Sequence, residues 1–274
     1  MPQDFTLHTH SIGFDGRNTV IEMVARAADL GFKTIGISNH FILHPEIKKT
    51  NFYPHAVSNG YPKIYNSNLN EIMALFVPHY RELSRVADTA KIRVLRGAEV
   101  DFFNTPDWRR DFERATKILR PDYFIGSCHF VSMNNRLYNV HDIAHADSDA
   151  QDKMLTQYWK NIQAAASTGL FSWMAHLDLP KKVGIGKSEK WSDLEQETIE
   201  CLAKHNVAIE INTSFEAEPY PSPRILNFVA KNNVPVLFSD DAHRTEQIGR
   251  RFDDAARLCV NCGINNFFAL GRIK

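Results

Sequence analysis

Histidine is the residue type that most strongly indicates chemistry in this chain. The 274 residues include 12 histidines, and half of these stand at or just after the end of a short apolar run that predicts a buried strand. In a parallel α/β barrel, the carboxyl ends of all strands meet on one face. Imidazoles gathered there compete for hydrogen-bond donors unless a cation organises them, so we expect a metal site. The six histidines are His8, His10, His40, His129, His176 and His243.

Three carboxylates occupy positions of the same kind. Glu99 and Asp241 end apolar runs, and Asp15 follows His10 by five residues. Taken singly, each acid or histidine is better explained by hydrogen bonding at a barrel rim, but nine together exceed what one ion needs. Imidazole suits zinc and iron, whereas carboxylate suits manganese. We therefore expect about two to three divalent ions of zinc, iron or manganese.

A cluster of this kind has a characteristic chemistry. Metal ions about 3.5 to 4 Å apart hold a bridging hydroxide and stabilise both the attacking and the leaving oxygen of phosphoryl transfer. A bound ion also lowers the pKa of water from about 15.7 to about 7, which supplies a nucleophile at neutral pH. The residues therefore predict a metal-dependent phosphoric monoester hydrolase with a small phosphorylated substrate.

The elements that must position these residues alternate regularly. Seven short apolar runs alternate with longer amphipathic stretches, which is typical of parallel strands joined by crossover helices. We expect strands at residues 5–10, 34–39, 94–100, 123–130, 172–177, 207–212 and 234–239. We expect helices from a capping box at Thr19 to Gly31, and at 69–90, 107–118, 151–168, 192–205, 223–232 and 245–260. The prediction is an α/β fold, one barrel domain over residues 1–274, with loops at 41–67 and 133–150 over the site face.

Charge and composition argue against several classes of protein. Thirty-two basic residues balance 32 acidic ones, so no net positive field would attract a nucleic acid. The first residues lack the pattern of a signal peptide, and no apolar stretch approaches the roughly 18 residues of a membrane helix. We therefore expect a cytoplasmic protein without membrane or nucleic-acid partners. Four cysteines are too few for a disulfide framework, and the oligomeric state stays open.

The order of the motifs resembles that of the PHP (polymerase and histidinol phosphatase) domain family. Leu7-His8-Thr9-His10 followed by Phe14-Asp15-Gly16 is similar to the opening motif of that family. The further matching segments are Gly36–His40, Gly97–Glu99, Gly126–His129, His176–Asp178 and Ser239–His243. The resemblance spans residues 8–243 and implies a distorted (β/α)7 barrel, a PHP-type TIM-like barrel, that holds a trinuclear metal centre.

The resemblance also implies how the ligands are shared. It implies one ion on His8, His10, Glu99 and Asp241, a second on Glu99, His129 and His176, and a third on Asp15, His40 and His243. Glu99 would bridge two ions, and it would carry the catalysis together with Asp241 and His243. One departure is visible: many family members have Asp two residues before the first histidine, where this chain has Thr6. A carboxylate that supports the metal ligands would then be missing.

Three segments look like the histidinol-phosphatase branch of the family. They are Glu210–Ser214, Tyr220–Pro223 and His176–Leu179, the last followed by a basic pair. This likeness implies hydrolysis of L-histidinol phosphate to L-histidinol and phosphate, a step of histidine biosynthesis. The substrate contacts expected on this basis are Lys181, Lys182 and Arg244 for phosphate oxygens, Asn212 and Ser214 for other groups, and Glu210, Asn212 and Glu216 for the cationic leaving group.

Other functions stay open. The substrate would be another small phosphate, such as a nucleoside monophosphate, if aromatic side chains of the segment 41–67 stack a base. Those side chains are Phe52, Tyr53, Tyr61 and Tyr65. A phosphate at a nucleic-acid end is a further alternative. From a different class, a non-catalytic PHP module would bind metal and partners, but such modules usually lose ligands and this chain keeps them.

Overall fold

Seven parallel strands form the barrel of the structure, a computed structural model that describes residues 3–134, 136–215 and 219–273. They pair in the order β1-β2-β5-β6-β9-β10-β11. The strands are β1 (Phe5–Thr6), β2 (Thr34–Ile37), β5 (Arg93–Asp101), β6 (Tyr123–Ser127), β9 (Trp173–Met174), β10 (Ala208–Asn212) and β11 (Val236–Ser239). Beyond β1 and β11, Thr9 pairs in parallel with Ala242 and closes the ring. The predicted barrel of seven βα units is confirmed.

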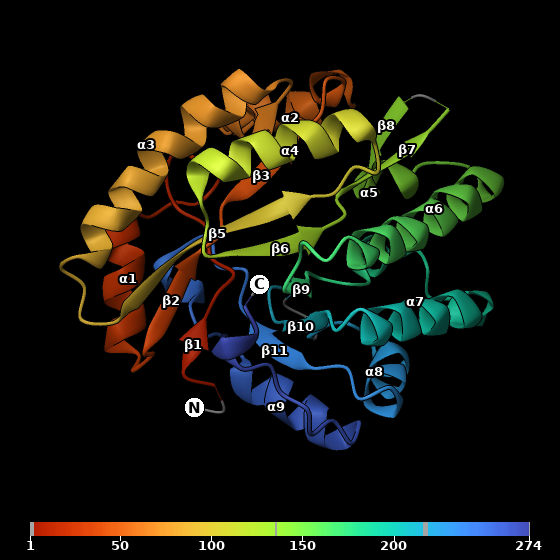
Figure 1. Cartoon of the computed structure of the whole chain (residues 1–274). Helices are drawn as coiled ribbons and strands as arrows, with labels where there is room; N and C mark the ends of the chain where they lie inside the picture. Colours follow the sequence, from red (N-terminus) through yellow and green to blue (C-terminus); the bar gives the residue numbers. More distant parts are fainter. Residues whose placement is uncertain (1–2, 135, 216–218, 274) are drawn as a thin grey trace.

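Helices cover the outside of the barrel (Figure 1). They are α1 (Val20–Asp29), α3 (Leu69–Ala87), α4 (Pro106–Leu119), α6 (Ser148–Ser167), α7 (Ser192–Lys204), α8 (Pro223–Lys231) and α9 (Phe252–Asn261). The predicted start of α1 is confirmed, because the Thr19 hydroxyl accepts from the Glu22 N–H and the Glu22 carboxylate accepts from the Thr19 N–H. Within the described ranges, no helix combines the length and the apolar composition that crossing a membrane requires.

The last helix begins later than the sequence predicted. Residues 245–247 form a short 3-10 turn, and α9 starts only at Phe252. Between them, Gly249 and Arg251 have φ angles of 70° and 56°, in the left-handed region that a right-handed helix cannot include. The predicted helix over 245–260 was therefore wrong in its first turns.

The two segments predicted as loops contain short regular elements. In residues 41–67 these are most of β3 (His40–Leu43), η1 (Ile47–Lys49), α2 (Tyr53–Ser58), η2 (Pro62–Ile64) and β4 (Tyr65–Asn66). The strand predicted at 123–130 ends at Ser127, and a hairpin of β7 and β8 follows it. The hairpin and the helix after it are β7 (Phe130–Met133), β8 (Arg136–Asn139) and α5 (Val140–Ile143). Elements this short leave too little periodicity for the sequence to indicate them.

Alternation along β5 links the barrel interior to the site. Leu95, Gly97 and Glu99 face the same way, because strand side chains alternate between the two faces. Beside them, Tyr123 is fully buried and stacks on Trp173 with ring centroids 5.2 Å apart. A Cβ on Gly97 would lie 2.2 Å from Cζ of Tyr123, so this position requires glycine. Apolar packing thus fills the barrel up to the level at which Glu99 begins the site.

We expect Gly97→Ala to destabilise the protein by about 1–3 kcal/mol, because overpacking forces a buried ring out of its place. Gly271→Ala is the matched control, since a Cβ at Gly271 would meet nothing within 4 Å. The free energy of unfolding from urea denaturation measures both changes. Equal effects of the two substitutions would contradict the role assigned to Tyr123.

Candidate metal centre

The nine predicted ligands converge at the carboxyl ends of the strands. Three overlapping groups have ligand atoms within 4.8 Å of one another: His10, Asp15, His40 and His243; His8, His10 and Asp241; and His40, Glu99 and His129. His176 joins them through Glu99, whose Oε1 lies 2.8 Å from Nε2 of His176. The structure therefore brings all nine side chains together. Asp15, His40 and His243 lie together, as the resemblance implied for one ion, and His40 also stands beside Glu99.

The Glu99 carboxylate lies at the centre of these groups. Its Oε2 is 3.3 Å from Nε2 of His8 and 2.8 Å from Nδ1 of His40. Its Oε1 is 3.5 Å from Nε2 of His129 and accepts a hydrogen bond of 2.5 Å from the Ser127 hydroxyl. The two oxygens thus face different histidines, an arrangement that suits a carboxylate shared by two ions.

Several buried ligand atoms lie close to one another but make no hydrogen bond of suitable geometry in the part of the chain that the structure describes. They are Nε2 of His8, both ring nitrogens of His10, Oδ1 of Asp15, Nδ1 of His40 and Oε2 of Glu99. Leaving one buried polar group unpaired costs about 1–3 kcal/mol. Divalent cations would satisfy these atoms together, and a mixed set of imidazole and carboxylate donors fits zinc, iron or manganese.

Two buried carboxylates, whose role the sequence did not predict, orient histidine rings. Oε2 of Glu210 accepts from Nδ1 of His8 at 2.8 Å, and Oδ2 of Asp101 accepts from Nδ1 of His129 at 2.9 Å. In both rings Nε2 then faces Glu99. Carboxylates in such positions fix ring orientation and make the ligating nitrogen more basic.

Thr6 stands at the position where many family members have an aspartate that supports the metal ligands. Its hydroxyl donates to Oδ2 of Asp240 at 2.9 Å, and the same oxygen accepts from the Gly249 N–H at 2.6 Å. Burial raises the pKa of Asp240 to about 6. The carboxylate that supports His8 comes instead from Glu210, on β10.

Burial and charge act against each other at the centre. Burial opposes protonation of His8 and His40, but neighbouring carboxylates outweigh it and raise the pKa of both rings well above the ordinary value. Burial also disfavours charge on Glu99 and Asp241, but the surrounding histidines hold the pKa of both carboxyls well below the usual range. Metal ions would replace the protons on the histidines, so metal affinity should fall as the pH falls.

Two ligand residues also have unusual backbone conformations. His176 has a φ angle of 24° and Asp241 one of 46°, in the left-handed region that residues other than glycine rarely adopt. Such conformations cost free energy and persist where the surrounding structure holds them in place. Each residue stands two positions after the end of a short barrel strand, so the turn out of the strand directs each side chain into the site.

Lys182 is the predicted phosphate contact that lines the cavity at the centre. Its ammonium donates to the Ser214 hydroxyl at 3.0 Å and lies 4.7 Å from the centroid of the Tyr220 ring. Burial lowers the pKa of Lys182, although the charges of Asp241 and Glu210 act in the opposite direction. Ser214 thus holds Lys182 in place, while its own contact with a substrate stays a prediction.

Lys181 and Arg244 lie elsewhere. The Lys181 ammonium pairs with buried carboxylates, 3.1 Å from Asp178 and 3.3 Å from Glu195, and donates to the Ser222 hydroxyl. These contacts give Lys181 a structural role. Arg244 is exposed and does not line the cavity, so the phosphate contacts expected of Lys181 and Arg244 stay predictions.

The partners expected for a cationic leaving group lie beneath the site. Glu210 is fully buried and accepts from the His8 ring, from the His176 N–H and from the Asn212 amide. Asn212 is fully buried as well, and its carbonyl oxygen accepts from the Ser214 N–H. Both residues support the site from below, and their contact with a substrate stays a prediction. Glu216 lies outside the described residues.

A cavity of about 310 Å³ opens onto the metal ligands. Its walls come from both segments that were predicted to lie over the site face, which confirms that part of the prediction. They include Phe52, Tyr61, Ile64 and Tyr65 from one segment, and Asn139, Val140 and His141 from the other. Tyr53 of the expected aromatic set is not among the lining residues and packs on Tyr65 instead, with ring centroids 5.8 Å apart.

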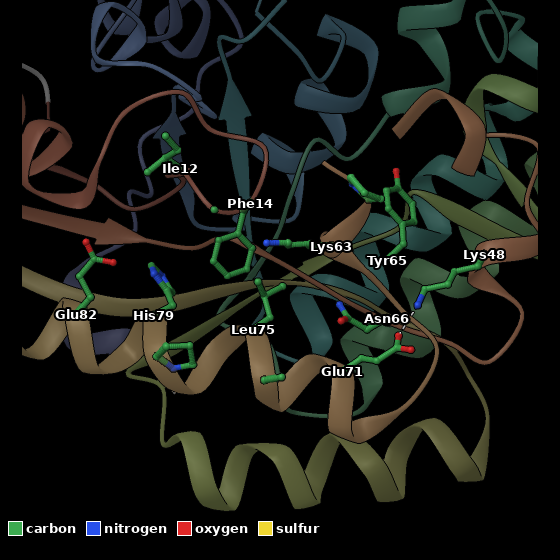
Figure 2. Close-up of a pocket in the computed structure, with 14 residues that line it drawn as sticks. Ile12, Phe14, Lys48, Lys63, Tyr65, Asn66, Glu71, Leu75, His79 and Glu82 are labelled. Atoms are coloured by element: carbon green, nitrogen blue, oxygen red, sulfur yellow. Dashed lines mark hydrogen bonds and ion pairs between the residues drawn. The ribbon is translucent and has the colours of Figure 1, made fainter. Parts of the chain in front are cut away.

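A second cavity, of about 710 Å³, runs along α3 behind the metal centre (Figure 2). His79 on its wall is neutral, because burial lowers its pKa to about 4, and its Nε2 accepts from the Asn39 amide at 3.0 Å. Asn39 precedes His40, and Phe14, which precedes Asp15, packs its ring 5.0 Å from that of His79. His79 therefore supports two ligand-bearing segments from outside, a role the sequence did not indicate.

The fold and the ligands identify the class of protein. The sequence matches the PHP domain family over residues 4–214, which include seven of the nine predicted ligands. The chain belongs to the PHP domain family. The two remaining ligands, Asp241 and His243, follow β11 beyond the matched region and complete the same centre.

Two proteins are similar to this chain in sequence, and one solved structure is similar to it in fold. A protein of Deinococcus radiodurans named "Probable histidinol-phosphatase" is 29% identical over 177 residues, which are 63% of this chain and 66% of that protein. A protein of Schizosaccharomyces pombe with the same name is 22% identical over 281 residues, 94% of this chain and 87% of that one. Histidinol phosphate phosphatase from Lactococcus lactis subsp. lactis, solved with zinc, L-histidinol and phosphate, has a TM-score of 0.67 at 17% identity and covers 99% of each chain. That last likeness is one of fold.

We expect Glu210→Gln to weaken metal binding roughly 10–100-fold, because the His8 ring loses the negative charge that raises its basicity. Glu197→Gln, on the exposed face of α7, is the matched control and should leave affinity unchanged. Competition with a chelating indicator measures the dissociation constant for zinc in both variants. If Glu210→Gln binds zinc as tightly as the control does, Glu210 has no part in orienting the ligand.

Proposed function

We propose that this chain is a metal-dependent phosphatase that hydrolyses L-histidinol phosphate to L-histidinol and phosphate. The observation that carries the proposal is the set of buried, mutually facing ligand atoms beside a cavity lined by Lys182. The names of the Deinococcus and Schizosaccharomyces relatives support the choice of substrate. The cofactor would be about two to three ions of zinc, iron or manganese.

The nine predicted ligands would hold the ions, with Glu99 between two of them. When bound, such ions supply a water of lowered pKa and positive charge for the phosphoryl oxygens. Glu210 and Asp101 keep the ligating nitrogens of two histidines facing inward. Asp241 and His243, at the edge of the cavity, complete the catalytic set that we propose with Glu99.

Lys182 would bind the phosphate group. It lines the same cavity as the ligands, and its ammonium is held by Ser214, which reduces the freedom it would lose on binding. A lysine contributes a compact point charge and so suits a single phosphate oxygen. The metal ions would neutralise the other oxygens.

A nucleoside monophosphate is the second candidate substrate. The observation that favours it is the aromatic wall of the cavity, where Phe52, Tyr61 and Tyr65 lie together. Aromatic side chains stack nucleobases without requiring a particular hydrogen-bond pattern. The imidazole of histidinol is also a flat ring, so this wall serves either substrate.

A comparison of kcat/KM for the two candidate substrates decides between them. We expect metal-replete protein to hydrolyse L-histidinol phosphate at least as efficiently as AMP under the same metal conditions. Phosphate release from both esters, measured over a range of concentrations, gives the ratio. A tenfold preference for AMP, which is about 1.4 kcal/mol in transition-state stabilisation, would reverse the assignment.

We expect Glu99→Gln to abolish turnover while the fold remains intact, because a neutral amide cannot replace a carboxylate shared between two ions. Circular dichroism and thermal unfolding check the fold, and Glu197→Gln again serves as the control. If Glu99→Gln keeps more than about a tenth of wild-type turnover, a barrier change below about 1.4 kcal/mol, the bridging role is wrong.

A further inference from the structure

Two stacked rings form part of the wall of the metal-site cavity. Phe52, at the start of α2, lies on His141 of α5 with ring centroids 5.6 Å apart and 14° between the ring planes. Both side chains line the cavity. The pair joins the two segments that cover the site face, and it lies in the wall of the same cavity as the metal ligands.

His141 contributes a neutral ring to this surface. Burial, together with the positive charges of His129 and Lys182, lowers the pKa of His141. The ring therefore stacks at neutral pH without carrying a charge of its own. His141 lines the same cavity as His129 and Lys182, the residue proposed to bind the phosphate.

The same cavity offers little to an ammonium group. Among its described lining residues the carboxylates are Asp15 and Asp241. Asp15 already lies 3.1 Å from both His40 and His243, and Asp241 lies 3.2 Å from His10. Both carboxylates are themselves predicted metal ligands, so among the described lining residues an amine on the leaving group meets no carboxylate that is free to pair with it.

The positive charge of Lys182 also disfavours an ammonium group in the cavity. Its ammonium lines the cavity and would repel a second cation at short range. A flat, uncharged ring meets no such penalty, and it gains contact with Phe52 and His141. Charge and shape in the cavity therefore favour the ring of a leaving group over its amine.

We propose that this protein recognises its leaving group through a planar ring packed against the Phe52–His141 pair, and not through an amine. This rests on the proposed phosphatase function, because it concerns the same site. It extends the substrate class to phosphate monoesters whose leaving group carries a flat ring, with or without an amine.

Three esters separate the ring from the amine. L-histidinol phosphate has both groups, 3-(imidazol-4-yl)propyl phosphate has the ring alone, and L-alaninol phosphate has the amine alone. We expect kcat/KM for the ring-only ester to lie within about threefold of that for L-histidinol phosphate, and kcat/KM for L-alaninol phosphate to be at least about tenfold lower. The reverse order would overturn the proposal.

Variants of Phe52 test whether the preference for ring-bearing esters arises at this residue. Phe52→Ala should lower kcat/KM for the two ring-bearing esters about tenfold and leave L-alaninol phosphate nearly unchanged. Phe52→Tyr should restore the ring preference. Val57→Ala, at an exposed position of α2, is the control for the same segment and should change none of the three values. An equal loss on all three esters with Phe52→Ala would overturn the proposal, because it would place Phe52 in support of the metal centre.

The last variant changes two acids outside the described residues, Glu216 and Glu218, and tests whether they recognise the amine. If the double variant Glu216→Gln, Glu218→Gln loses activity only on the two amine-bearing esters, the amine is recognised there and the proposal falls. If L-histidinol phosphate is hydrolysed but depends on its amine, only this inference fails. If metal-replete protein hydrolyses none of the three esters, the proposed function itself fails.

Discussion

The close approach of imidazoles and carboxylates in one buried space is the constraint on which the structure depends. Ionised groups removed from water are strongly destabilising unless opposite charges or metals compensate them. Glu99 is 1% exposed, and the neighbouring His8, His10 and His40 each have a buried ring nitrogen without a hydrogen-bond partner among the described residues. Cations between these atoms would remove the penalty, so we infer that metal binding stabilises the fold and also creates the active site.

Closure of the barrel and assembly of this centre involve the same residues. The backbone N–H of His10 donates to the Ala242 carbonyl at 2.8 Å, and the Ala242 N–H donates to the His8 carbonyl at 3.2 Å. Asp241, beside Ala242, supplies a ligand directly at this seam. The last pairing of the barrel thus lies between ligand-bearing segments, and metal binding is expected to stabilise the closed ring.

The sequence predicted the ligands because all of them except Asp15 stand at or just after the end of an apolar run, and the barrel brings such ends together. It did not predict the roles of Glu210, Asp101 and His79, because an isolated polar residue in a strand or helix carries no sign of its partner. Glu210 was placed with the substrate for this reason. Its contact with His8 joins residues 202 positions apart, which only the folded structure reveals.

The segments 41–67 and 133–150 were also predicted only in part. Their polar composition predicted that they lie over the site, and Phe52 and His141 confirm it by lining the cavity. Their short strands and turns were not predicted, because two to six residues give no usable period. The ion pairs of Lys181 with Asp178 and Glu195 were not predicted, because Glu195 lies on α7 and meets Lys181 only in the folded structure.

The central claim is that the nine side chains form one polynuclear centre. Elemental analysis of metal-replete protein, after removal of loosely bound ions by gel filtration, tests it most directly. The account predicts about two to three transition-metal ions per chain. One ion or fewer per chain, in protein that unfolds cooperatively and is therefore intact, would contradict it.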